Sequence, residues 1–129
     1  MAEHNDIGKI GENITDTFLR NNGFVIIERN YRTRYGEIDI IAKKDNVLRC
    51  IEVKSVKVRE ILHVDNLAVK PEDNLTHDKW SKLTISVEIY LRHKNVTNQV
   101  DYQIDLACVY IDTETRQGRV RLLENVHRE

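Results

Sequence analysis

Apolar residues near the start of the chain recur with the period of a helix. The positions that share this face are Ile7, Ile10, Ile14 and Phe18. Asp6 is suited to cap the N-terminus of such a helix, and Asn22-Gly23 is suited to end it, because glycine readily adopts the left-handed conformation common after a helix. We therefore expect a first helix over about residues 6–21.

Three segments with the pattern of strands follow this helix. Apolar and β-branched residues predict strands over residues 24–31, 37–42 and 47–54. Lys43-Lys44-Asp45-Asn46 separates the last two segments and has the length and chemistry of a hairpin turn. Residues 56–74 carry only a weak pattern, and we expect a long loop or irregular insertion there.

A second helix and two further strands complete the pattern. The helix, over about residues 76–93, carries an apolar stripe made by Trp80, Leu83, Val87, Tyr90 and Leu91. Alternating residues predict strands over 100–111 and 119–123. The order α-β-β-β-α-β-β favours the α/β (α+β) class, with a mixed sheet flanked by helices. A length of 129 residues suits one domain over 1–129.

Composition and charge exclude several classes of protein. Lys and Arg number 20 against 21 Asp and Glu, and a net charge of -1 excludes a histone-like polycation and a charged disordered tail. The longest apolar run, residues 106–111, is far shorter than the roughly 20 residues of a membrane span. Residues 1–6 have no basic region and no apolar core, so we expect no secretory signal there. Cys50 and Cys108 form no metal-ligand pair, so we expect a soluble protein of the reducing cytoplasm.

One segment is basic although the whole chain is nearly neutral. Residues 29–59 contain nine basic and four acidic side chains. Such a segment is a candidate phosphate-binding face, because phosphate contacts supply most of the non-specific affinity for nucleic acid. The candidate nucleic-acid-binding residues are Arg29, Arg32, Arg34 and Lys57. The competing interpretation is a solvated sheet surface.

Two carboxylates and a lysine carry the candidate chemistry. Strand periodicity puts Glu52 and Lys54 on one face, and Asp39 lies between Ile38 and Ile40 in the preceding strand. If these strands pair, the two carboxylates converge and repel each other, by about 4 kcal/mol at ~4 Å and an effective dielectric constant near 20. Protonation, pairing with Lys54 or a divalent cation would each relieve that repulsion. An ion pair between Glu52 and Lys54 on an exposed strand edge is the competing interpretation.

Ordered sequence blocks resemble a known family. Gly36-Glu37-Ile38-Asp39 followed by Ile51-Glu52-Val53-Lys54 resembles the D…E-x-K signature of the restriction-endonuclease-like PD-(D/E)XK nucleases. More narrowly, the chain resembles the YraN family, which is regarded as distantly related to archaeal Holliday-junction resolvases. The other matching blocks are Gly8-Lys9-Ile10-Gly11-Glu12, Arg29-Asn30-Tyr31-Arg32, Lys79-Trp80-Ser81-Lys82-Leu83 with Tyr90-Leu91, and Ile104-Asp105.

The resemblance implies a restriction-endonuclease-like core and a metal-dependent endonuclease acting on DNA, including branched or structured DNA. It implies that Asp39 and Glu52 bind Mg²⁺ or Mn²⁺, that Glu12 is a further metal ligand, and that Lys54 is the catalytic lysine. No organic cofactor is expected. By analogy with the resolvases, which act as dimers, a homodimer is expected as well.

Two other functions stay open from the sequence. Where the family often carries arginine, this chain has Val56 and Gln103, which favours a catalytically inactive nucleic-acid-binding module on the same fold. A protein-interaction domain with purely structural acids is the third alternative. Glu37 shares the strand face of Asp39, but the motif assigns it no ligand role, and we expect it to be solvated or beside the ligands.

Overall fold

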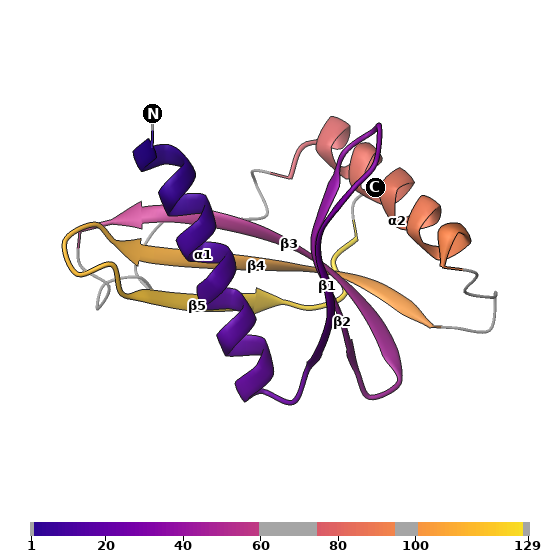
Figure 1. The fold of residues 1–129 in the computed structure, drawn as a ribbon, viewed down its shortest axis with the longest axis horizontal. Coiled ribbons are helices and arrows are strands. Elements are labelled where there is room, and N and C mark those ends of the chain that lie inside the picture. The colour runs from indigo at the N-terminus through magenta and orange to yellow at the C-terminus, as the bar shows by residue number, and fades with distance from the viewer. Residues whose placement is uncertain (1, 60–74, 95–100, 128–129) are drawn as a thin grey trace.

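A computed structural model describes residues 2–59, 75–94 and 101–127 of the chain (Figure 1). Its elements are α1 (Ala2–Asn21), β1 (Val25–Arg32), β2 (Glu37–Lys44), β3 (Val47–Val58), α2 (His77–His93), β4 (Tyr102–Asp112) and β5 (Gly118–Leu123). The predicted order of elements is confirmed. No helix in the described ranges is both long and apolar enough to cross a membrane.

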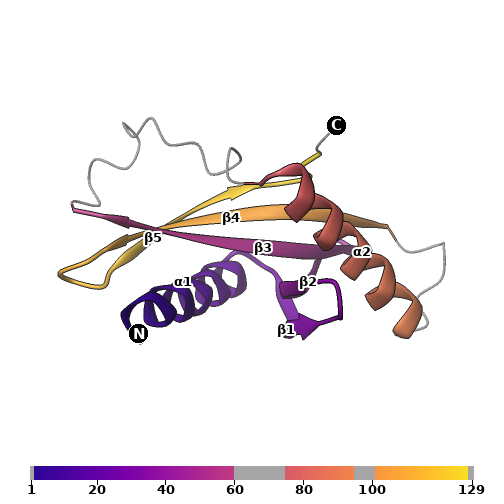
Figure 2. The ribbon, with the colours of Figure 1, turned by 90° about the horizontal axis from the view of Figure 1, so that it is seen from above.

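Within the described residues, five strands form one sheet in the order β1-β2-β3-β4-β5. β3 and β4 run parallel, while the other neighbouring strands pair antiparallel, so the sheet is mixed as predicted. The parallel pair needs a crossover connection, and α2 lies in it. The hairpin of β1 and β2 bends out of the plane of β3, β4 and β5 and lies between α1 and α2 (Figures 1 and 2).

α1 ends at the predicted glycine. Gly23 has a φ of 86°, in the left-handed region that glycine adopts without strain. Its N–H donates to the Arg20 carbonyl at 3.4 Å, and the Phe24 N–H donates to the Leu19 carbonyl at 3.0 Å. Leu19 and Phe24 also belong to one buried cluster, which completes a Schellman-type helix end.

Two predicted boundaries are wrong by more than two residues. α1 begins at Ala2 and not at Asp6, because Ala2 and Glu3 are strong helix formers and extend the helix by one turn. β3 continues to Val58, although residues 56–58 were expected to lie in a loop, because they pair in parallel with β4. The rest of that predicted loop, residues 60–74, lies outside the described residues.

The turn between β2 and β3 fixes the register in which these two strands pair, and both strands carry candidate site residues. Asp45 and Asn46 have φ values of 54° and 62°, both in the left-handed region, as a two-residue turn of type I′ requires. The antiparallel ladder starts beside this turn and ends at the pair Ile40 and Ile51. The two strands therefore separate at the next pair of residues.

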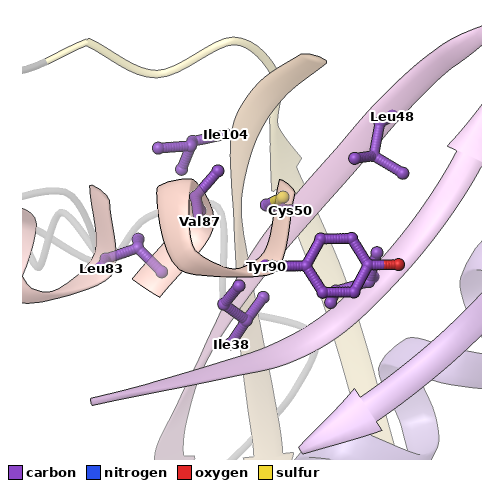
Figure 3. Packing of buried hydrophobic residues seen from close by; sticks show 8 residues of the cluster. Ile38, Leu48, Cys50, Leu83, Val87, Tyr90 and Ile104 are labelled. Atoms are coloured by element: carbon purple, nitrogen blue, oxygen red, sulfur yellow. The ribbon is translucent and has the colours of Figure 1, made fainter. Parts of the chain in front are cut away.

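Hydrophobic clusters hold a helix against each face of the sheet. Leu83, Val87 and Tyr90 of α2 face strand residues in Figure 3, where the strand partners are Ile38, Leu48, Cys50 and Ile104. On the other face, Leu19 of α1 packs with Phe24, Ile40, Ala42, Ile51 and Ala107. The sheet is thus covered on both sides around β2 and β3, where the candidate carboxylates lie.

Candidate active site

Asp39 lies where β2 twists and stops pairing with β3. Residues two apart in a strand normally share a face, yet Ile38 packs in the cluster of α2 and Ile40 in the cluster of α1. Asp39, between them, accepts a hydrogen bond from the Val53 N–H on Oδ2 at 2.8 Å. The carboxylate therefore takes the place of a backbone carbonyl just beyond the last ladder pair and anchors the fork between the strands.

Glu52 of β3 meets Asp39 in this fork. The two half-buried carboxyl groups share a hydrogen bond. Burial, and then repulsion from Asp39, raises the pKa of Glu52 to about 9. Burial also raises the pKa of Asp39 to about 6, although the hydrogen bond from the Val53 N–H opposes that rise. The pair therefore holds one shared proton near neutral pH.

α1 contributes Glu12 to the same region. Gly11 precedes it, and a Cβ at Gly11 would overlap the Ser55 Oγ, so the missing side chain lets α1 approach β3 closely. The buried Glu12 accepts hydrogen bonds on Oε1 from the Arg29 Nη2 at 2.8 Å and the Arg29 Nε at 3.1 Å. Its Oε2 accepts a hydrogen bond from the Asn30 Nδ2 at 3.0 Å.

Asn30 links Glu12 to Glu37. The same Nδ2 that donates to Glu12 also donates to the Glu37 Oε1 at 2.9 Å. Asn30 has a φ of 54°, a left-handed conformation that asparagine tolerates better than most residues. One amide group thus holds two carboxylates side by side.

The described residues contain one acidic cluster with the spacing of a metal site. Glu12, Glu37 and Asp39 each offer one carboxylate oxygen, and these oxygens lie within 4.8 Å of one another. Glu52 is not a member of this set, although it touches Asp39. Glu37 had no assigned ligand role in the sequence, where its only signal was the strand face it shares with Asp39.

A pocket of about 280 Å³ opens at the fork. Its lining residues are Gly36, Glu37, Asp39, Glu52, Lys79, Lys82 and Leu83. The two lysines come from α2 and are additions to the candidate residues chosen from the sequence. The signal that could have found them is their helical spacing, since Lys79 and Lys82 flank the side of α2 on which the buried Leu83 lies.

Lys54, the candidate catalytic lysine, is not among the pocket-lining residues. It lies two residues beyond Glu52 on β3, half-buried, in register with Cys108 of β4. Within the described part of the chain it forms no hydrogen bond or ion pair. The structure thus brings Asp39, Glu52 and Glu12 into one region, and it leaves Lys54 at the margin.

The four candidate nucleic-acid-binding residues have different surroundings. Arg29 is committed to Glu12 and to Asp16, whose Oδ2 lies 3.4 Å from the Arg29 Nη1. Arg32 is 80% exposed, with its Nε 3.4 Å from the Glu37 Oε2. Arg34 stacks over the ring of its neighbour Tyr35. Lys57 lies near the end of β3, on the opposite face from Glu52 by strand alternation.

Asp105 has a structural role. It is fully buried, and its carboxylate accepts hydrogen bonds from the Arg49 Nη1 at 3.1 Å, the Gln103 Nε2 at 2.8 Å and the Asn125 N–H at 2.9 Å. These bonds tie the segment after β5 to β3 and β4. Asp105, part of the matching block Ile104-Asp105, therefore serves to hold these segments together.

Comparison with known proteins places the chain in a family. A family model described as "Uncharacterised protein family UPF0102" matches residues 11–109, a range that contains every candidate site residue. A UPF0102 protein of Campylobacter lari is 39% identical over 118 residues, which cover 90% of this chain and 88% of that protein. A UPF0102 protein of Clostridium botulinum (strain Loch Maree) is 32% identical over 120 residues, covering 93% and 92%. The chain therefore belongs to the UPF0102 (YraN) family, which its sequence blocks predicted.

Proposed function

We propose that this protein is a Mg²⁺- or Mn²⁺-dependent endonuclease that hydrolyses phosphodiester bonds in branched or otherwise structured DNA. The observation that carries the proposal is the meeting of Asp39 and Glu52 in an open pocket at the fork of two strands. Strongly raised pKa values at a concave site are typical of functional carboxylates. The D…E-x-K resemblance to the restriction-endonuclease-like nucleases points the same way.

The donor atoms in the pocket suit a hard divalent cation. Carboxylate oxygens are the ligands that Mg²⁺ and Mn²⁺ prefer. Oxygens on opposite sides of a Mg²⁺ ion lie about 4 Å apart, and the cluster oxygens, within 4.8 Å of one another, are close to that spacing. This spacing is that of Glu12, Glu37 and Asp39, so we propose that these three carboxylates hold the ion. We propose Glu52 as a further ligand because it contacts Asp39 and because the D…E-x-K resemblance implies it. When bound, the ion supplies stabilisation of the negative charge that develops on the phosphate oxygens.

The residues of the chain prepare this site in distinct ways. The Val53 N–H keeps the Asp39 carboxylate in place, and Glu52 must release its proton before both carboxylates are available as ligands. Arg29 and Asn30 hold Glu12. Lys54 is proposed to orient a water molecule or to accept its proton.

Cleavage assays with matched variants test the proposal. Wild type and Asp39→Asn, Glu52→Gln and Lys54→Ala variants are compared on linear duplex, single-stranded and four-way-junction DNA with Mn²⁺. Glu88→Gln, a change of the same type on the exposed side of α2, is the control. We expect cleavage by wild type and the control and its loss in the three site variants. Equal cleavage by wild type and Asp39→Asn would contradict the catalytic role.

A catalytically inactive nucleic-acid-binding module is the second candidate. Two observations favour it: Lys54 does not line the pocket, and Glu12 already has hydrogen bonds from Arg29 and Asn30. This candidate predicts salt-dependent DNA binding without cleavage, and DNA affinity that Glu52→Gln leaves unchanged.

The proposal also includes a homodimer in the cytoplasm, by resemblance to the resolvases. Light scattering coupled to size exclusion measures the oligomeric state directly. A monomer at micromolar concentration, with or without DNA, would contradict the dimer but not the hydrolysis.

A further inference from the structure

We propose that Lys79 and Lys82 of α2 bind the phosphate backbone of the substrate at the pocket, an inference that rests on the proposed function. Neither lysine was among the four basic residues chosen from the sequence. Both line the same pocket as Asp39 and Glu52.

The geometry of α2 presents the two lysines as a pair. They are three residues apart, so they are neighbours on the helix surface. Leu83, which also lines the pocket, is buried in the cluster that packs α2 on the sheet. Packing of Leu83 therefore fixes the position of the helix backbone from which both lysines extend.

A second set of contacts fixes the distance across the pocket. The turn before β2 touches α2 through Thr33, whose Oγ1 lies 2.8 Å from the Ser86 Oγ. A Cβ at Gly36 would lie 3.5 Å from the Lys82 Cβ, which is ordinary contact distance. Gly36 directly precedes Glu37, so the wall that carries the lysines and the wall that carries the acids are held close together.

Among the described residues, neither lysine is held by a strong ion pair. Lys82 lies 3.1 Å from the Asp78 Oδ2, but both side chains are more than half exposed, and such surface pairs are weak. Lys79 forms no ion pair within the described ranges, and its charge favours the ionised form of Glu52. The Lys79 ammonium group therefore lowers the pKa of Glu52 without forming an ion pair with a described carboxylate.

The acidic side chains of the pocket make nearby lysines necessary for an anionic substrate to bind. Glu37 and the Asp39–Glu52 pair, which holds one proton, still carry negative charge that repels a phosphodiester, so an anionic substrate needs positive charge on the facing side of the pocket. Arg29 is occupied by Glu12 and Asp16. Lys79 and Lys82 fill this role at the pocket itself.

DNA binding without divalent cations tests the proposal separately from cleavage. Fluorescence anisotropy with a labelled four-way junction in EDTA, from 50 to 200 mM salt, measures affinity and its salt dependence. Each of Lys79→Gln and Lys82→Gln should weaken binding roughly five- to tenfold near 0.1 M salt and reduce the log–log salt slope by about 0.9. Lys79→Arg and Lys82→Arg should keep the slope.

Lys43→Gln is the matched control, because Lys43 is an exposed lysine at the far end of β2. Wild-type affinity and slope in the Lys79→Gln/Lys82→Gln double variant would overturn the proposal. So would an equal loss in Lys43→Gln, or a wild-type protein that binds no DNA at 50 mM salt. Absence of cleavage together with the expected binding losses would reject the nuclease activity and keep the phosphate-binding pair. Mn²⁺ affinity of the double variant, measured by calorimetry, should stay at the wild-type level or increase, which a general disruption of the pocket would not allow.

Discussion

Asp39 of β2 accepts a hydrogen bond of 2.8 Å from the backbone N–H of Val53 on β3. This bond lies just beyond the last ladder pair, Ile40 and Ile51, and joins strands that have begun to separate. It holds one carboxylate of the site independently of any ligand. The second carboxyl group, that of Glu52, is buried beside it, and this burial, followed by repulsion from Asp39, raises the pKa of Glu52 to about 9.

The stability of the protein should fall as the pH rises. In the unfolded chain Glu52 loses its proton near 4.5, whereas in the folded protein it keeps the proton until about 9. Below pH 4.5 Glu52 is protonated in both states, and its contribution to stability is fully present. Between these values the folded state binds more protons, so the free energy of unfolding decreases by at most about 1.4 kcal/mol per pH unit. Asp39 adds a smaller decrease between about 4 and 6.

Urea unfolding at several pH values measures this dependence. Glu52→Gln should flatten the curve above pH 6 and be more stable than wild type at pH 8, with no such advantage at pH 4.5. Glu88→Gln should follow wild type. A wild-type stability that rises from pH 6 to pH 9 would contradict the shared proton.

Metal binding should release a proton. Because Glu52 is protonated at neutral pH, a cation that takes both carboxylates displaces that proton. We expect the Mn²⁺ affinity to rise by up to about tenfold per pH unit between pH 6 and 9. Calorimetry in buffers of different ionisation enthalpy counts the protons released. Glu52→Gln should bind Mn²⁺ more weakly and release none, and a pH-independent wild-type affinity would argue against this linkage.

The side chain of Asn30 should stabilise the fold because it donates to two carboxylates at once. Removing its side chain leaves the buried Glu12 and the neighbouring Glu37 without their shared donor. We expect Asn30→Ala to lower the free energy of unfolding by about 1–3 kcal/mol. Asn30→Gly also loses the hydrogen bonds but adopts a φ of 54° freely, so it should be about 1 kcal/mol more stable than Asn30→Ala. Equal stability of the two variants in urea titrations would contradict a strained backbone at this position.

Lys54 should matter for activity and not for stability. Since it contacts none of the described residues through a hydrogen bond or ion pair, Lys54→Ala should change the free energy of unfolding by less than about 0.5 kcal/mol. Loss of a proton-transfer group lowers rates by roughly 10²–10⁴-fold, and we expect a loss of cleavage in that range. Single-turnover assays with Mn²⁺ measure this loss, with Lys43→Ala as control. Unchanged cleavage in Lys54→Ala would remove the lysine from the mechanism and favour another base.

Local patterns in the sequence predicted much of the fold. The apolar stripes of α1 and α2, the glycine that ends α1, and the Asp45-Asn46 turn all depend on contacts between near neighbours. The short turn between the segments that form β2 and β3 is also a local feature. It was sufficient to predict that Asp39 and Glu52 lie on adjacent strands. The length of β3 was not predictable in this way, because its last residues pair with β4, about 50 positions away.

The sequence by itself determined which chemical groups are available: carboxylates on two adjoining strands, a lysine beside one of them, and a glutamate on the first helix. The tertiary structure alone decided which of them meet. It joined Glu37 to Glu12 through Asn30, brought Lys79 and Lys82 to the pocket, and left Lys54 outside its lining. It also buried Glu52 beside Asp39, which raises the pKa of Glu52. The physical reason is that burial and charge interactions depend on distances between elements remote in sequence, which no local pattern specifies.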